Sequence, residues 1–263
     1  DVREDYYGEW LLNTNPYRYW TRADADGSFS IDNIRPDDYN VYVWKAGVYG
    51  ETSKKDIKIK AGEKQDVGTI VLKPKSKGEL IWQIGVPNRT VTEYKNGNNF
   101  HQWDNFLRYR KDFPDGVNFV IGESDISQDW NYLQPEAVQG EWKPTTWSVK
   151  FDLEKIPDGR PVLTTVYGGR DADLDVILNG EKISELVMDI NHIGANIRSA
   201  PYGELLEKHI EFDPDVLKEG ENELLLTFNK GMVDENVEQD SFRRGWYHHI
   251  GYDFIRLEVM DSE

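Results

Sequence analysis

The chain has 263 residues and a mass of 30.6 kDa, which gives room for two modest domains with their own cores. It contains no cysteine, so disulfides and thiolate chemistry are excluded, and no apolar run approaches the ~20 residues of a membrane span. The net charge of -17 argues against nucleic acid as a partner.

The N-terminal part of the chain predicts a small β-domain. Short alternating runs, each bounded by turn residues, lie at 28–31, 39–44, 55–60 and 67–72. Period-two alternation with β-branched and aromatic side chains is typical of strands. We therefore predict a small sandwich of the fibronectin type III or transthyretin type over residues 1–76, with a polar linker containing Pro and Gly at 73–78.

Residues 77–263 predict a larger all-β domain. Strand-like runs lie at 145–153, 160–167, 174–178, 224–228 and 252–259. Asn179-Gly180 follows the third run and is a strong hairpin signal. Strands of this number and spacing indicate a sandwich, and their order resembles the jelly roll of galactose-binding-type carbohydrate modules. Residues 203–210 could form a helical turn.

Four stretches together resemble one family. They lie at 17–50, at 82–90 (Trp-Gln-Ile-Gly-Val-Pro-Asn-Arg-Thr), at 129–130 (Asp-Trp) and at 252–258 (Tyr-Asp-Phe-Ile-Arg-Leu-Glu). The sequences of these stretches resemble those of the rhamnogalacturonan lyases of polysaccharide lyase family 4. The resemblance covers nearly the whole chain, but only the second and third domains of that family. Residues 29–44 also resemble carboxypeptidase-regulatory-like modules, which are usually spacers.

The resemblance implies a non-catalytic chain. In this family a lysine and a histidine of a large N-terminal β-sandwich carry out β-elimination at the rhamnose–galacturonate linkage, and nothing here resembles that domain. Implied partners are that catalytic domain and a pectic polysaccharide, either rhamnogalacturonan or an oligogalacturonide. The resemblance also implies an extracellular protein. Because Asp1-Val-Arg-Glu-Asp carries no secretory signal, we expect either a removed signal or a chain cut from a longer protein.

The net charge conflicts with the implied partner. Galacturonate carboxylates make pectin a polyanion, and an acidic protein repels it over about one Debye length, ~8 Å at physiological ionic strength. Binding would then need a local basic patch, bound calcium, or recognition of neutral sugars.

The densest group of candidate binding residues precedes the last predicted strand. It comprises Arg243, Arg244, Trp246, Tyr247 and His248. A guanidinium can grip a sugar carboxylate, and an aromatic face can cover the C–H surface of a sugar. In the alternative, which we favour slightly, the aromatic residues are core and the arginines neutralise neighbouring carboxylates.

A second candidate is the stretch 191–199, which is rich in amide and guanidinium donors. In the family a glycine and an asparagine precede an arginine here, so the resemblance assigns carbohydrate binding to Asn196 and Arg198. Such donors suit hydroxyl and carboxylate recognition. A buried Arg198 that holds the long connection in place is an equal alternative.

Independent elimination by this chain is a less favoured hypothesis. It needs a cation for the uronate carboxylate and a base for the adjacent proton, which Arg244 with His249 or Tyr247 could supply. Adjacent histidines in a strand point to opposite faces, so His248 and His249 cannot act as a pair without a bulge.

No cofactor is required, but structural calcium is a candidate. Asp171, Asp173 and Asp175 alternate, so an extended backbone places them on one face, where like charges repel unless a cation lies among them. Solvation of the three carboxylates is the favoured alternative. For Asp24-Ala25-Asp26-Gly27 a hairpin turn is favoured over a calcium loop.

Tryptophans are frequent in the second predicted domain. Trp82 and Trp147 occupy phased strand positions and are expected in the core, whereas Trp103 and Trp130 lie in loop-like sequence. Sugar stacking is possible for the latter pair, but we favour packing. The leading hypothesis is thus a spacer followed by a sugar-binding jelly roll, and its rival is a pair of support domains that bind no sugar.

Overall fold

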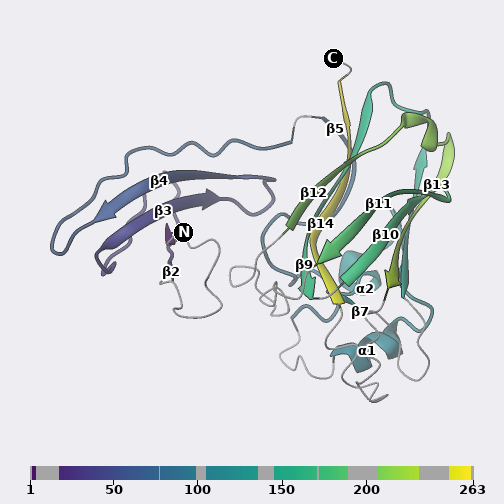
Figure 1. The fold of residues 1–263 in the computed structure, drawn as a ribbon, viewed down its shortest axis with the longest axis horizontal. Helices are drawn as coiled ribbons and strands as arrows, with labels where there is room; N and C mark the ends of the chain where they lie inside the picture. The colour runs from purple at the N-terminus through teal and green to yellow at the C-terminus, as the bar shows by residue number, and fades with distance from the viewer. Residues whose placement is uncertain are drawn as a thin grey trace. The chain divides into compact units, whose positions relative to one another are not determined.

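The computed structural model describes residues 2–3, 18–76, 78–98, 105–135, 145–170, 172–188, 206–230 and 249–261. Contacts divide the chain into two compact units, Asp1–Lys77 and Gly78–Glu263. The division falls one residue after the boundary expected between 76 and 77. Both units are built from β-strands (Figure 1), so the all-β class predicted from the sequence is confirmed.

The first unit is a four-stranded antiparallel sheet in the order β2-β1-β3-β4. Its strands are β1 (Val2–Arg3), β2 (Arg18–Tyr19), β3 (Asp37–Trp44) and β4 (Glu51–Ile59). The β3–β4 hairpin brings Tyr39 opposite Ile57. These two residues and Val41 are the buried centre of the small core.

Two predicted strands of the first unit, at 28–31 and 67–72, are not strands in the structure. Ile31, Val67 and Ile70 nevertheless pack against the buried cluster. Gly68 has a φ of 63°, and its N–H donates to Asp66 Oδ1 at 2.7 Å, so the backbone turns where a ladder needs extended residues. The alternation in these segments therefore reports burial and not strand pairing.

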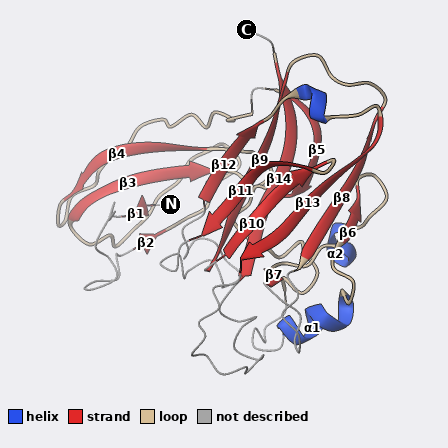
Figure 2. Cartoon of the chain, turned by 45° about the vertical axis from the view of Figure 1, so that its right-hand side comes forward, coloured by secondary structure: helices blue, strands red, loops and turns tan. Residues whose placement is uncertain are grey.

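The second unit is a sandwich of two sheets (Figure 2). In order, the first sheet contains β11 (Glu181–Met188), β10 (Ala172–Leu178), β13 (Gly220–Lys230), β8 (Thr146–Leu153) and β6 (Asn118–Val120). The second contains β12 (Leu206–Glu211), β9 (Arg160–Arg170), β14 (His249–Met260) and β5 (Glu79–Gly85), with β7 (Gln134–Pro135) paired to β14. Short helical elements are α1 (Asn105–Asp112), α2 (Ile126–Asp129) and η4 (Pro214–Val216).

Most strands of this unit lie where alternation predicts them. The runs at 145–153, 160–167, 174–178, 224–228 and 252–259 coincide with β8, β9, β10, β13 and β14. In β10 every second residue from Ala172 is buried, because one face of the strand meets the core. Asn179 and Gly180 both have positive φ, at 52° and 88°, as the predicted two-residue hairpin requires.

The helical turn expected at 203–210 is wrong for the part that the structure describes. Leu206–Glu211 is strand β12, antiparallel to β9. Ile210 is buried opposite Leu163, and both belong to the core, so pairing along β9 outweighs the helix-like sequence.

Aromatic side chains dominate the core between the two sheets. Trp82 is 4% exposed, and Trp130 and Trp147 are 0% exposed, so packing is confirmed for these three. The Trp130 and Trp147 rings meet edge to face with centroids 4.8 Å apart. Trp103 lies outside the described residues. Of the helices that the structure describes, none combines the length and apolar character needed to cross a membrane.

Candidate functional site

All the predicted carbohydrate-binding residues lie outside the described part of the chain. Asn196 and Arg198 belong to the stretch between β11 and β12. The others fall between β13 and β14, namely Arg243, Arg244, Trp246, Tyr247 and His248. Their roles therefore stay predictions, and the structure defines only the strand ends on either side of them.

Those strand ends lie at one end of the sandwich. They are Met188 and Leu206 for the first stretch, and Lys230 and His249 for the second. Cross-strand pairs align them: Met188 with Ala172, Lys230 with Asp173, Leu206 with Tyr167 and His249 with Arg170. β9 ends and β10 begins at this same end. We call it the crossover end, because the chain passes there between the two sheets.

A buried polar network ties three strands together near the crossover end. The Tyr252 hydroxyl donates to Gln134 Oε1 at 2.9 Å. Gln134 Nε2 donates to the carbonyl of Leu226 at 2.9 Å and to that of Thr145 at 3.3 Å. Burial raises the pKa of Tyr252 well above its ordinary value, so the network is uncharged. It links β7, β13 and β14 to Thr145, the residue before β8, at the base of this end.

His249 is not placed to act as a base on a polymer. It is the first residue of β14 and is only 4% exposed. A Cβ on Gly169 would lie 2.1 Å from the His249 carbonyl oxygen, which shows how closely β9 and β14 approach here. Arg244 and Tyr247, its suggested partners, lie outside the described residues, so no eliminating group is assembled in the described part of this unit.

Asp253 of β14 holds the segment that follows β5. Its Oδ1 accepts the backbone N–H of Arg89 at 2.7 Å and that of Asn88 at 3.4 Å. Arg89 has a φ of 61°, which is uncommon for a residue with a side chain. The Tyr94 hydroxyl donates to the Asp253 backbone carbonyl at 2.8 Å. Residues 86–94 are thus fastened to β14 through both the side chain and the backbone of one residue.

Glu93 brings a second carboxylate to the same segment. Its Oε1 accepts the Val86 N–H at 3.0 Å and the Asn88 side-chain amide at 3.3 Å. The pKa of Asp253 is raised to about 7, mainly by burial and further by the Glu93 charge, although the two backbone N–H donors and the Arg89 charge lower it. Sequence reasoning missed Asp253. Its one signal is an acidic residue directly between two aromatic neighbours, Tyr252 and Phe254.

A polar row crosses the outer face of the sheet β12-β9-β14-β5. The row runs His209, Thr164, Arg256 and Gln83 in register. His209 Nδ1 lies 3.1 Å from Thr164 Oγ1, and Arg256 Nη1 donates to Gln83 Oε1 at 3.2 Å. Arg256 Nη2 also meets Glu258 Oε1 at 2.9 Å, and the side chains of this ion pair are 7% and 5% exposed. The His209 end of the row is exposed, and its second ring nitrogen, Nε2, lies 2.8 Å from Glu207 Oε1, whereas the Arg256–Glu258 end is buried.

Two of the three aspartates proposed for calcium, Asp173 and Asp175, share a face, as alternation predicts. Asp173 and Asp175 are half-buried on the outer side of β10, and Asp171 lies outside the described residues. Lys182 Nζ lies 2.5 Å from Asp175 Oδ1 and 3.7 Å from Glu185 Oε2, so one of the candidate aspartates is paired with an ammonium group. Within the described ranges, no three histidine, aspartate or glutamate side chains are grouped to hold a metal ion.

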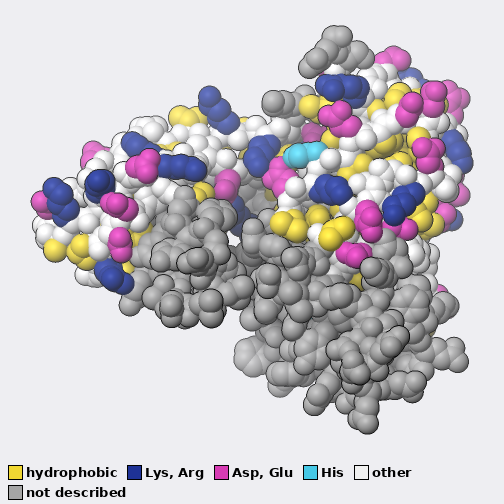
Figure 3. Space-filling view, in the orientation of Figure 1, with side chains coloured by type: hydrophobic (Ala, Val, Ile, Leu, Met, Phe, Trp, Pro, Cys, Tyr) yellow, Lys and Arg dark blue, Asp and Glu magenta, His cyan; other side chains and the backbone are white. Residues whose placement is uncertain are grey.

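The net negative charge comes entirely from the second unit. Asp1–Lys77 contains 13 basic and 13 acidic residues, which leaves 18 basic and 35 acidic residues for Gly78–Glu263. The second unit therefore carries the whole net charge of -17. On the face shown in Figure 3, acidic and basic side chains of the described surface are interspersed, without one continuous basic patch. A uronate polymer would thus meet repulsion at the larger unit.

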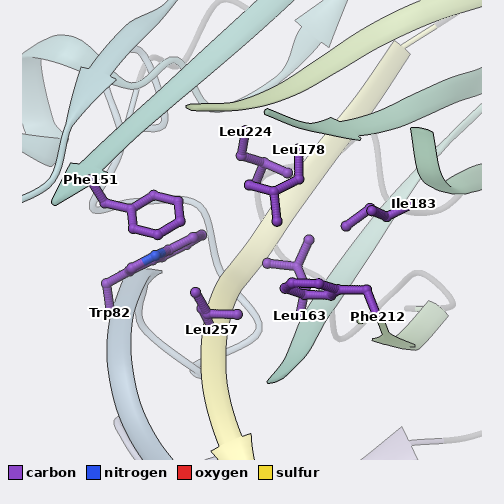
Figure 4. A pocket seen from close by; sticks show the side chains of 8 residues that line it. All are labelled: Trp82, Phe151, Leu163, Leu178, Ile183, Phe212, Leu224 and Leu257. Carbon is purple, nitrogen blue, oxygen red and sulfur yellow. The ribbon is translucent and has the colours of Figure 1, made fainter. Parts of the chain in front are cut away.

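The described cavity between the sheets is too small and too apolar for a sugar. Its volume is about 10 Å³, and its lining side chains point inward from both sheets (Figure 4). They are Trp82, Phe151, Leu163, Leu178, Ile183, Phe212, Leu224 and Leu257. A gap of this size without polar partners has no role in carbohydrate recognition.

Comparisons with known families and proteins agree with the two-unit architecture. Residues 80–257 match the family model described as polysaccharide lyase family 4, domain III, and residues 3–67 match domain II of the same family. Relatives include a probable rhamnogalacturonate lyase B of Aspergillus niger, 27% identical over 86% of this chain and 38% of its own length. The probable rhamnogalacturonate lyase C of Aspergillus oryzae is 28% identical over 96% of this chain and 41% of its own. The chain thus spans about two fifths of these relatives.

Solved structures give a weaker likeness. A carbohydrate-binding module CBM36 in complex with calcium and xylotriose is 9% identical, with a TM-score of 0.28 over 49% of this chain and 89% of its own. The Podospora anserina GH26-CBM35 mannanase is 11% identical, with a TM-score of 0.27 over 51% of this chain and 26% of its own. Both TM-scores are low, so neither likeness carries weight for function.

Proposed function

The chain belongs to polysaccharide lyase family 4, and because it matches domains II and III of that family, we propose that it binds pectic polysaccharide without cleaving it. In this proposal the parent protein is a rhamnogalacturonan lyase that cleaves by β-elimination in a separate N-terminal domain. The chain holds rhamnogalacturonan near that domain, and the parent protein is secreted. The relatives named rhamnogalacturonate lyases support this proposal.

One observation carries the location of the proposed site. The strand ends that flank both predicted binding stretches, Met188, Leu206, Lys230 and His249, belong to the crossover end. Guanidinium and aromatic groups on stretches that are attached at the same end of a sandwich can bind one ligand together. We therefore propose that Asn196, Arg198 and the residues at 243–248 contribute to one sugar site.

The charge distribution restricts the proposed ligand. A unit of net charge -17 repels long runs of uronate. Rhamnogalacturonan alternates a neutral rhamnose with each galacturonate, so it presents half the charge density of homogalacturonan. We expect rhamnogalacturonan to bind more tightly than homogalacturonan. Added salt should reduce this difference in affinity, because it screens the repulsion between the acidic unit and the uronates.

Calorimetric titration tests the proposal directly. The chain is titrated with rhamnogalacturonan oligosaccharides and with homogalacturonan oligosaccharides, with and without calcium, while ultraviolet absorbance reports unsaturated product. Heat without product is expected. Product from the purified chain would contradict the non-catalytic assignment.

A pair of matched variants locates the site. Arg243→Gln with Arg244→Gln should weaken binding at least about tenfold, because each guanidinium–carboxylate contact contributes over 1 kcal/mol. Arg160→Gln is the control, since Arg160 begins β9 at the opposite end and its side chain is 49% exposed. Equal loss of heat in both variants would contradict a site at the crossover end.

The rival function is support without sugar binding. It is favoured by the concentration of acidic charge in the second unit, which opposes a polyanion. Neither heat nor product with any pectic oligosaccharide would make support of the catalytic domain the better account.

A further inference from the structure

Residues 86–94 are held to β14 by an unusual combination of groups. A buried carboxyl, that of Asp253, is the acceptor for two backbone N–H groups of one segment. The same segment carries a second acidic residue, Glu93, and Asn88 links the two carboxylates: its backbone N–H donates to Asp253 and its side-chain amide donates to Glu93. Two carboxylates brought together in a poorly hydrated place favour a state in which one of them holds a proton. We call Asp253 with residues 86–94 the clamp.

The contacts leave a defined place for that proton. Both backbone N–H groups donate to Oδ1 of Asp253, and the structure gives no hydrogen bond to Oδ2 from the described residues. Oδ2 can therefore carry a proton without breaking either bond to Asn88 or Arg89. The neutral acid keeps both bonds, and it avoids placing a second negative charge next to Glu93.

We propose that the clamp is operated by a proton: it is closed in mildly acidic solution, and it opens more often as the solution becomes neutral. When residues 86–94 leave β14, Asp253 returns to water and releases its proton. Closing takes the proton up again. The segment follows β5 and lies next to Gly85, so its opening changes the surface beside that strand.

The sign of the effect follows from the charges around Asp253. Burial and the Glu93 charge oppose ionisation, whereas the two N–H donors and the Arg89 guanidinium favour it. Burial is the largest of these effects, so the pKa of Asp253 is raised. The Tyr94 hydroxyl donates to the Asp253 backbone carbonyl. A group whose pKa is higher in the closed state stabilises closing fully below its ordinary pKa, 3.8, and this stabilisation is lost as pH rises to about 7.

The size of the effect can be given as a change in the opening equilibrium. With a pKa of about 7 when closed and 3.8 when open, the fraction of open clamp rises about 50-fold between roughly pH 5 and pH 7. Above about pH 8 it changes little further, because Asp253 is then ionised in both states.

Hydrogen exchange of the Arg89 and Asn88 amides measures the opening. Their protection, corrected for the intrinsic pH dependence of exchange, should fall by about 50-fold from roughly pH 5 to pH 7 in the unmodified chain. In Asp253→Asn the amide oxygen still accepts both N–H groups and the NH₂ stands where the proton would be. Its protection should therefore be high and independent of pH. Asp152→Asn, an exposed position on β8, should behave as the unmodified chain.

Three results would overturn the proposal. One is a parallel fall in protection in the unmodified chain and in Asp253→Asn. Another is lower protection in Asp253→Asn at all pH values, which would mean that the charge of Asp253 holds the segment. The third does not depend on any variant: direct NMR titration of the Asp253 carboxyl carbon with a midpoint near its ordinary value. A raised midpoint with a pH-dependent loss of protection supports the clamp.

Discussion

Trp130 and Trp147 offer a comparison in which only one N–H group differs. Both are 0% exposed in the same aromatic core, with ring centroids 4.8 Å apart. The Trp147 Nε1–H donates to the Tyr109 hydroxyl at 2.8 Å. The Trp130 Nε1–H is buried without a hydrogen-bond partner among the described residues. Replacing each by phenylalanine removes a similar part of the ring but has opposite consequences for hydrogen bonding.

The expected costs follow from these contacts. Loss of ring atoms and the small cavity left behind cost about 2 kcal/mol at either position. Trp147→Phe also removes a hydrogen bond of about 1 kcal/mol and leaves the Tyr109 hydroxyl unpaired. Trp130→Phe instead removes an unpaired buried N–H, which offsets about 1 kcal/mol or more of its cost. We expect Trp147→Phe to be less stable than Trp130→Phe by about 2 kcal/mol or more.

Urea unfolding followed by far-ultraviolet circular dichroism measures both variants. Adding Tyr109→Phe to Trp147→Phe should recover part of the loss, because no hydroxyl is then left without its donor. Equal destabilisation of the two tryptophan variants would refute the reasoning and would mean that the Trp130 N–H is satisfied in solution.

Three further expectations concern the same unit. Arg256→Met or Glu258→Leu alone should each lower the free energy of unfolding by about 3–5 kcal/mol, because a buried charge loses its partner. The double variant should approach the stability of the unmodified chain in urea. Additive losses in the double variant would contradict this expectation. Gly85→Ala should be much more destabilising than Gly122→Ala. Both glycines have φ near 87°, but only a Cβ at position 85 would meet other atoms within 4 Å. Similar melting temperatures of the two variants would contradict a steric collision at position 85. Lys182→Gln should make thermal stability respond to calcium, because two carboxylates lose their shared ammonium group, and an unchanged melting curve with calcium would reject that view.

Local periodicity accounts for much of the fold. The buried positions of β10 and the apolar core positions of β8 follow from alternation, and Asn179-Gly180 forms the hairpin that its sequence predicts. Alternation fails where burial occurs without a ladder partner, as around Gly68 in the first unit. It also fails at β12, where helix-like sequence pairs with β9.

Less of the candidate site than of the fold could be predicted from the sequence. The basic and aromatic residues near 243–248 were found by composition, but composition does not say which strand ends lie together. Cross-strand register supplies that information, since it aligns Met188, Lys230 and His249 at the crossover end. Likewise the three aspartates predicted a cation, whereas the position of Lys182 on the neighbouring strand depends on a hairpin register with a bulge.

The sequence by itself determined the all-β class, most strands of the second unit, its hairpin turn and the location of the excess acidic charge. These depend on neighbouring residues, through the two-residue repeat of a strand and the turn preferences of Asn and Gly. Only the tertiary structure decided that Asp253 holds Arg89, 164 positions away, and that Thr164 lies between His209 and Arg256. Such contacts depend on strand order and register, which the summed packing of the whole core selects and no local pattern encodes.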